Sequence, residues 1–423
     1  MVFGVAAASR SIAAAAAAAA SPSSMGMNAG GIDRAESNEC GVKVLDMSAY
    51  YSGDPHKLKD FVTQLHVQCR TTGFFYLQNH SVPQHLCDDM LQLARKFFTS
   101  SLDTKMSIDY TQSAQFRGYM RLGWENTAGL SDYREQLDFG PEEEEEADMI
   151  NGRLNHLVYP LYRRLRGPNQ WLSNETIPHF RPIVENFMLK MSTFSMEVMK
   201  CIALSLGLSK DYFDSSFGHR PHYQMKVARY PPVPEPEMGG NGSLYGVGPH
   251  TDSGYLSFLL QDDVGGLQAL SKDGNWIDVL PRRGTFVVNL GEMLQLATNG
   301  LYLATMHRVV NCQGQKSRYS VPFFFNPRLD AKVEHIPITE FSNAGSKDAY
   351  PNAPVSNFPV RGNENCGARN KIFPIFGDNA FKSFARSHPQ LVKMHHPDLR
   401  EADGTIVFRE SAGDNGYVLY FPS

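Results

Sequence analysis

Between residues 255 and 326 the sequence alternates short β-type runs with turn signals at intervals close to ten residues. Strands that follow one another this closely are typical of an antiparallel sandwich or barrel rather than of βαβ units. We therefore expect a jelly-roll-like β domain in this part of the chain. The runs are YLSFLLQ, GLQAL, NWIDVL, TFVVNL, TMHRVVN and RYSVPFFFN.

The part that precedes this β segment has helical periodicity instead. Apolar residues recur at steps of three and four over residues 58–65, 86–97 and 180–201, which predicts three helices. The aromatic run GFFYLQN at 73–79 predicts a short strand. One more helix is expected at 379–387. Helices followed by a β domain make the expected fold class α+β.

The composition is that of a globular protein with small partners. Of the 423 residues, 42% are hydrophobic, enough for one large or two medium cores. The chain has 40 Lys and Arg and 44 Asp and Glu, and it has no long basic stretch. We therefore expect no nucleic-acid or membrane partner. The sequence does not indicate the oligomeric state. Six cysteines without a CxxC pair predict reduced thiols, and no apolar run is long enough for a membrane span.

Residues 1–32 differ from the rest of the chain. Arg10 is their only charged side chain, and alanine fills positions 13–20. An acid-poor, Ser-rich segment that bears an arginine is typical of a transit peptide. The expected localisation is organellar in that case and cytoplasmic if the segment is an inert low-complexity tail. In either case a segment with so little large apolar surface is expected to be disordered.

Three side chains of the β segment form a candidate metal site. His250 and Asp252 are two apart in GVGPHTDSG, and residues i and i+2 of a strand point to the same face. His307 lies in another β-type run, far enough along the chain for the intervening strands to return it to the first pair. Two histidines and one carboxylate are the facial triad that binds non-haem Fe(II) and leaves coordination positions open. A second H-x-D, His396 and Asp398, has no histidine downstream, and we interpret it as background.

Arg318 and Ser320 form a candidate anion-binding pair. They share one strand face in KSRYSVPFFF, beside three phenylalanines among which a bare arginine would be costly to bury. A guanidinium matches a carboxylate in bidentate geometry, and a serine hydroxyl can donate one more hydrogen bond. The pair is therefore interpreted as a receptor for the distal carboxylate of a small acid that chelates the metal through its other end.

Several motifs, in the right order, resemble those of the 2-oxoglutarate- and Fe(II)-dependent dioxygenases of the isopenicillin N synthase-like family. In the N-terminal part these are GFFYLQNH at 73–80, RGY at 117–119, GPNQW at 167–171 and ALSLGL at 203–208. In the β segment they are HTDSGYLSFLLQDDVGGLQAL, WIDVLP, VVNLGE, HRVVN and RYSVPFF. The resemblance covers most of residues 42–395. It implies a double-stranded β-helix, a cupin-like jelly roll, with an N-terminal helical region and flanking helices.

Composition and the resemblance together predict a division into four parts. A tail or transit peptide at 1–32 precedes a helical domain at 42–210, which is followed by the catalytic β-helix domain at 220–330. The C-terminal extension at 331–423 is interpreted as a candidate lid.

Site residues and cofactors follow from the resemblance position by position. It makes His250, Asp252 and His307 the iron ligands and catalytic residues, and Arg318, Ser320 and Tyr230 the binders of 2-oxoglutarate. An asparagine that many members place two residues before this tyrosine is Ala228 here. The implied reaction uses Fe(II), 2-oxoglutarate and O2, with ascorbate as a candidate reductant. It oxidises a small organic metabolite, most often by hydroxylation, and releases succinate and CO2.

Two other functions fit the same residues. An Fe(II) oxidase of the isopenicillin N synthase or ethylene-forming type would use the triad without 2-oxoglutarate, and its arginine would hold a substrate carboxylate or bicarbonate. A non-catalytic β-helix protein would bind a small molecule, although a binder has no need of three iron ligands. The substrate is not readable from the sequence. Candidate lining residues are Phe116, Arg117, Tyr119 and Tyr245, whereas His388 is expected at the surface or at a helix cap.

Overall fold

Eight strands form one sheet in the order β1-β2-β14-β11-β16-β9-β6-β3. The structure is a computed structural model that describes residues 42–127, 130–144, 149–150, 153–154, 160–233, 245–311, 316–338 and 372–399. The strands of this major sheet are β1 (Val44–Asp46), β2 (Phe74–Gln78), β3 (Gly118–Met120), β6 (Glu135–Phe139), β9 (His222–Tyr230), β11 (Leu256–Gln261), β14 (Thr285–Leu290) and β16 (Arg318–Asn326).

A second sheet has the order β10-β15-β12-β13 and is antiparallel throughout. Its strands are β10 (Tyr245–His250), β12 (Leu267–Leu270), β13 (Trp276–Asp278) and β15 (His307–Val310). Two short hairpin pairs complete the described strands, β4 (Asn126–Thr127) with β5 (Leu130–Ser131) and β7 (Met149–Ile150) with β8 (Arg153–Leu154). Two facing, mostly antiparallel sheets are the double-stranded β-helix that the sequence predicts, and this prediction is confirmed.

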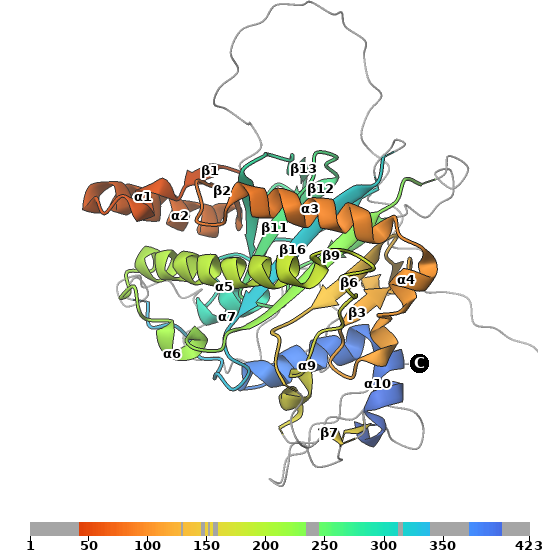
Figure 1. Ribbon diagram of the computed structural model, residues 1–423. Helices are drawn as coiled ribbons and strands as arrows, with labels where there is room; N and C mark the ends of the chain where they lie inside the picture. The colour runs from red at the N-terminus through yellow and green to blue at the C-terminus, as the bar shows by residue number, and fades with distance from the viewer. Residues whose placement is uncertain are drawn as a thin grey trace, which may run out of the picture. The chain divides into compact units, whose positions relative to one another are not determined.

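Helices cover the outer face of the major sheet. Figure 1 shows α3 and α5 lying beside each other along the strands, and both contact β16. The α-helices are α1 (Ser48–Tyr51), α2 (Pro55–Thr71), α3 (Gln84–Phe98), α4 (Leu102–Met106), α5 (Phe180–Ser205), α6 (Asp214–Phe217), α7 (Glu292–Ala297), α9 (Phe376–Ser387) and α10 (Pro389–His395). The 3-10 turns are η1 (Tyr110–Gln112), η2 (Leu161–Leu165) and η6 (Pro397–Leu399).

The alternation of side chains along β2 explains why the molecule has two cores. Phe75 and Leu77 join the large core beneath the helices. Phe74 and Tyr76, on the opposite face of the same strand, join a smaller core that contains residues of both sheets. The strand is therefore buried on both faces, which is why GFFYLQN has so few polar positions.

Capping residues and apolar periodicity explain the positions of the helices. Asp54 caps α2 by accepting hydrogen bonds from the backbone N–H groups of His56 and Lys57, and Pro55 occupies the first helical position. The apolar stripe of α3, which includes Met90 and Phe97, is buried as its periodicity predicts. The helices expected at 58–65, 86–97, 180–201 and 379–387 are α2, α3, α5 and α9.

All the residues that the structure describes belong to one compact unit. Strands β1, β2, β3 and β6, which precede residue 210, belong to the major sheet together with the later strands. The tail at 1–32 and most of the candidate lid lie outside the described residues, so the expectations for them stay predictions. Among the described cysteines, Cys69, Cys87 and Cys201 are buried and unbridged. No described helix combines the length and the apolar character needed to span a bilayer.

Candidate active site

His250, Asp252 and His307 converge on one point. Their candidate ligand atoms all lie within 4.8 Å of one another. Asp252 Oδ1 is 3.7 Å from His250 Nε2 and 3.8 Å from His307 Nε2. The two histidines are direct partners across the antiparallel pair of β10 and β15, and their ring centroids are 4.3 Å apart.

The route by which Asp252 reaches this point differs from the prediction. His250 is the last residue of β10, and Asp252 lies in the irregular segment before β11. Strand alternation therefore does not place the carboxylate beside the imidazole. Instead the backbone turns after His250 and is held against the start of α7, where Glu292 N donates to Asp252 O at 2.7 Å and Met293 N donates to Gly254 O at 3.0 Å.

Two glycines permit this close backbone approach. A Cβ on Gly291 would collide with the backbone of Gly254, and a Cβ on Gly254 would collide with the side-chain amide of Asn326. Thr251 adds a short hydrogen bond from its hydroxyl to the Glu292 carboxylate. The segment that carries Asp252 is thus fixed on both sides by contacts of its backbone and of Thr251.

Hydrogen bonds orient both imidazoles toward the common point. Nδ1 of His250 lies 2.9 Å from the carbonyl oxygen of Gly248, and Nδ1 of His307 lies 3.0 Å from that of Thr305. A carbonyl oxygen can only accept, so each Nδ1 carries a proton, and in a neutral imidazole of this tautomer Nε2 keeps its lone pair. Burial, reinforced by the neighbouring His307, lowers the pKa of His250 to about 4. The neutral imidazole that a metal requires is therefore the stable form of His250 near neutral pH.

The two oxygens of the Asp252 carboxylate have different partners. Its Oδ2 accepts hydrogen bonds from Ser257 Oγ at 2.5 Å and from Asn289 Nδ2 at 2.7 Å, which leaves Oδ1 to face the histidines. Burial acts to raise the pKa of Asp252, but the two histidines and these two hydrogen bonds outweigh it and hold the pKa below its usual value. Ser257 and Asn289 were not among the predicted site residues, although each is a polar residue within an apolar strand run.

Arg318 lies fully buried on β16. Its Nη1 donates to Ser320 Oγ at 3.2 Å and its Nη2 donates to Gln261 Oε1 at 3.1 Å, while the guanidinium lies 4.9 Å from the Tyr230 ring centroid. The buried Arg318 Nε and Gln261 Nε2 have no hydrogen-bond partner among the described residues. Two unsatisfied buried donors beside a buried positive charge fit an anionic group. Sequence reasoning missed Gln261.

Arg318 and the histidines face the same interior. Tyr230, which stacks against Arg318, packs in the core between the sheets together with Phe74. Phe74 in turn contacts the His307 ring edge-on, with centroids 5.4 Å apart. The predicted pairing of Arg318 with Ser320 and Tyr230 is present, and this group shares the inter-sheet space with the triad.

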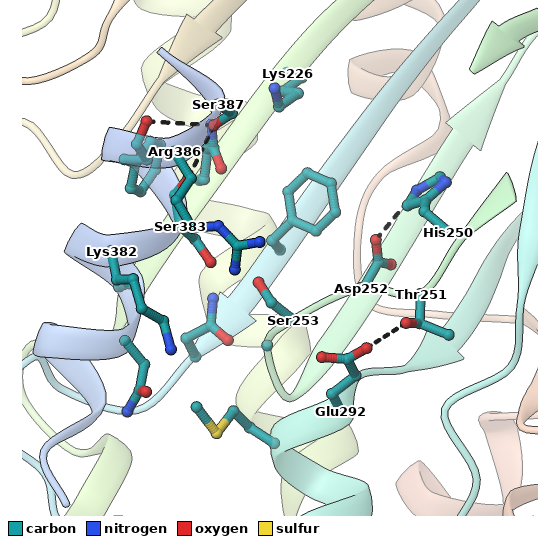
Figure 2. A pocket seen from close by; sticks show the side chains of 18 of the residues that line it. Lys226, His250, Thr251, Asp252, Ser253, Glu292, Lys382, Ser383, Arg386 and Ser387 are labelled. Atoms are coloured by element: carbon teal, nitrogen blue, oxygen red, sulfur yellow. Dashed lines mark hydrogen bonds and ion pairs between the residues drawn. The ribbon is translucent and has the colours of Figure 1, made fainter. Parts of the chain in front are cut away.

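A cavity of about 390 Å³ borders His250 and Asp252. Figure 2 shows their side chains across this space from Lys382, Ser383 and Arg386 of α9. On its remaining walls lie Glu125, Arg134, Lys226, Thr251, Ser253, Glu292, Phe324 and His388, among others. A volume of this size suits a small molecule, and the lining is unusually rich in charged groups.

The four residues proposed to line a substrate pocket do not line this cavity. Phe116 packs against Phe381 and Phe384 of α9. Arg117 donates to backbone carbonyls such as those of Pro141 and Leu165. The other two, Tyr119 and Tyr245, contact Glu135 and Arg308 respectively. All four serve packing and loop support instead.

Two histidines outside the triad also have defined places. His388 is buried at the cavity wall rather than at the surface, and it occupies a helix cap, between the end of α9 and the start of α10. His396 is buried as well, stacked on Phe116, and Asp398 forms a bidentate ion pair with Arg164. The second H-x-D thus has a structural role that its sequence did not reveal.

Comparison with known proteins identifies the family. The model of the 2OG-Fe(II) oxygenase superfamily matches residues 221–327, and the one described as "non-haem dioxygenase in morphine synthesis N-terminal" matches residues 42–174. A 2-oxoglutarate-dependent dioxygenase of Dothideomycetidae sp. is 36% identical over 71% of this chain and 77% of its own length. The chain belongs to the 2OG-Fe(II) oxygenase superfamily. Homoarginine-6-hydroxylase of Glycine max is 34% identical over 73% of this chain and 92% of its own length.

A solved structure agrees with these relatives. The crystal structure of a full-length Neurospora crassa protein in complex with alpha-KG superposes with a TM-score of 0.63, at 26% identity, over 76% of this chain and 96% of that chain. The chain is thus an oxidoreductase of the isopenicillin N synthase-like group that uses Fe(II), 2-oxoglutarate and O2, and the predictions of family, activity and cofactors are confirmed. The oxidase and the non-catalytic binder are not favoured.

Proposed function

We propose that His250, Asp252 and His307 hold the Fe(II), and that Arg318, with Ser320 and Tyr230, holds the far carboxylate of 2-oxoglutarate. The convergence of three ligand atoms of the facial-triad type within 4.8 Å carries this proposal. The substrate would be a small organic molecule in the adjoining cavity, and hydroxylation would release succinate and CO2.

The chemical types of the three donors fit Fe(II). Imidazole and carboxylate ligands suit this ion, and a set of three leaves the remaining positions for the oxoacid and dioxygen. When bound, iron and 2-oxoglutarate supply the oxidising chemistry, in which O2 decarboxylates the oxoacid and oxidises a C–H bond of the substrate. The backbone carbonyls at Gly248 and Thr305 hold both Nε2 atoms toward the metal.

The protein supplies position and enclosure. Arg318 offers two parallel donors to a carboxylate, and the orphaned N–H groups of Arg318 and Gln261 would gain partners there. The inert aromatic rings of Phe74 and Tyr230 line the space between the two sheets. Because the oxoacid is held from its far end, its chelating end can be presented to the metal in one orientation.

The experiment is reconstitution of the protein with Fe(II) under anaerobic conditions, followed by addition of 2-oxoglutarate and O2. We expect succinate to form in proportion to the O2 consumed. Asp252→Ala should abolish both iron retention, measured as bound metal after desalting, and succinate formation, since it removes the charged ligand. Asp88→Ala, which alters an exposed carboxylate, is the matched control and should retain both. Iron retention by Asp252→Ala at the wild-type level would contradict the ligand assignment.

A further inference from the structure

The wall of the cavity that faces the metal ligands is formed by one helix. The residues of α9 that border the cavity include Asn379, Ala380, Lys382, Ser383, Arg386 and Ser387. Lys382 and Arg386 are four residues apart, so their side chains lie one above the other on the helix surface. Figure 2 shows both extending from α9 toward the side on which Ser253 and Asp252 lie.

Another group of charged residues on the cavity lining, Glu125, Arg134 and Lys226, is held in ion pairs. Arg134 Nη2 lies 2.7 Å from Glu125 Oε2, and Lys226 Nζ lies 2.9 Å from Glu125 Oε1. Asp132 and Asp138 approach the same two cations at 3.1 and 3.6 Å. In this buried network two cations are paired with three carboxylates, so it offers no excess positive charge to an anionic ligand.

The α9 wall carries two positive charges four residues apart, and both interact electrostatically with the Glu292 carboxylate, which also lines the cavity. Lys382 is only 6% exposed, and burial, followed by the charge of Arg386, lowers its pKa to about 8, with Glu292 acting in the opposite direction. Both cations also have other interactions within the fold, and what singles them out is their shared place on the cavity wall.

We propose that Lys382 and Arg386 form an anchoring subsite for an anionic group of the substrate, a carboxylate or a phosphate, at the α9 wall of the cavity. The proposal deepens the function proposed above and rests on it, because the same cavity borders two of the three iron ligands. The substrate class is a small metabolite with an anionic group at one end and an oxidisable C–H bond at the other. Ser383, between the two cations in sequence, can add a hydroxyl donor.

The geometry explains why the anion would bind at α9 and not elsewhere in the cavity. Near the metal, Asp252 and Glu292 would repel it, whereas Lys382 and Arg386 attract it from the far wall. Anchoring at α9 therefore holds the anionic group away from the metal and directs the rest of the molecule toward His250 and Asp252. A neutral analogue of the same shape would lose this orientation.

The test uses the full chain loaded with Mn(II) and 2-oxoglutarate under anaerobic conditions, so that binding is measured without turnover. Calorimetry compares a panel of small carboxylates with the matching phosphate monoesters and with the uncharged methyl esters. We expect anions of one class or both to bind, and the esters to bind at least about ten-fold more weakly, as the loss of a charge-assisted hydrogen bond implies. Whether carboxylates or phosphates bind more tightly identifies the source of the charge.

Variants locate the subsite. Lys382→Met and Arg386→Met should each weaken the best anion about ten-fold, while Arg386→Lys should restore part of the affinity because it keeps the charge. Lys393→Met, on an exposed position of α10 outside the cavity, should leave binding unchanged. Melting temperatures confirm that each variant folds.

The outcomes separate this inference from the function on which it rests. If no anion of the panel binds, or if the esters bind as well as the acids, the anionic subsite is wrong. The same holds if the Lys382→Met and Arg386→Met variants bind anions like the wild type. If instead anions bind at α9 but the iron-loaded enzyme forms no succinate, the subsite stands and the proposed function fails.

Discussion

The two oxygens of Asp252 differ in their contacts, and this difference bears on the proposed metal site. Asn289 and Ser257 occupy Oδ2 and thereby aim Oδ1 at the histidines. Asn289→Ala should remove the orienting amide and weaken Fe(II) binding about ten-fold, the lower end of what such supporting contacts contribute. Metal competition with a fluorescent chelator measures the affinity. Asn275→Ala, an exposed site, is the control, and equal affinities for the two variants would show that Asn289 does not orient the ligand.

Arg318 provides a second prediction at this scale. Arg318→Lys keeps the positive charge but loses the bidentate fork, so 2-oxoglutarate binding should weaken by about 1.5 to 3 kcal/mol with metal affinity unchanged. Titration of 2-oxoglutarate into the Mn(II) protein measures the first quantity, and metal competition measures the second. An unaltered affinity for 2-oxoglutarate would show that another cation holds the oxoacid.

The triad and the Arg318 group could be predicted because the types of their residues and the spacing between them indicate their chemistry. The residues that support them were not. Ser257, Asn289 and Gln261 are ordinary polar side chains, and only the pairing of β11 with β14 and β16 brings them to Asp252 and Arg318. The sequence shows that these polar residues are present. Their hydrogen-bond partners depend on the register of the strands, which a single sequence does not reveal.

At the scale of elements, an ion pair links the segment after α10 to the rest of the fold. Arg164, in η2, is completely buried, and its guanidinium makes two hydrogen bonds to Asp398, in η6, at 3.0 and 2.7 Å. Asp398→Ala leaves this charge buried without its carboxylate and should lower the free energy of unfolding by about 3 kcal/mol. Urea denaturation measures the change.

The control for this prediction is a surface pair. Arg283 and Asp88 are 2.9 Å apart, but both side chains are well exposed. Asp88→Ala should therefore alter the free energy of unfolding by less than about 1 kcal/mol. Similar small changes in both variants would mean that the Arg164 pair contributes no more than a surface contact.

Elements with a regular apolar period were the ones that the sequence predicted well. Helices α2, α3, α5 and α9 and the strands from β11 to β16 all follow the expected runs. The turn after His250 was not foreseen, because its shape depends on contacts with α7, about 40 residues further along the chain. The position of α9 at the cavity wall could not be predicted either, because the amphipathic pattern of a helix does not indicate which surface the helix will cover.

At the scale of the whole molecule, the two hydrophobic cores have different roles. The large core beneath α3 and α5 stabilises the major sheet, while the small inter-sheet core surrounds Arg318 and the triad. His250 and His307 are brought together only by the antiparallel register of β10 and β15, so the metal site depends on correct pairing of distant strands. This arrangement places the chemistry inside the β-helix and leaves the helices to support it from outside.

The last prediction concerns residues 1–32, which precede this fold. They contain a single charged side chain and few large apolar ones, so they can bury little surface against the cost of ordering a backbone, about 1 to 2 kcal/mol per residue. Deletion of the segment should leave both the melting temperature and succinate formation unchanged. A lower melting temperature would instead show that the segment docks on the fold.

A reporter fusion can show whether this segment carries a targeting signal. We propose that the protein is organellar if residues 1–32 act as a transit peptide and cytoplasmic if they are an inert tail. Fused to a fluorescent protein, the segment should direct the reporter into an organelle in the first case, and Arg10→Ala should weaken that import because the segment has no other side-chain cation. A diffuse reporter with and without the substitution would exclude targeting by this segment, since a working transit peptide acts independently of the domain that follows it.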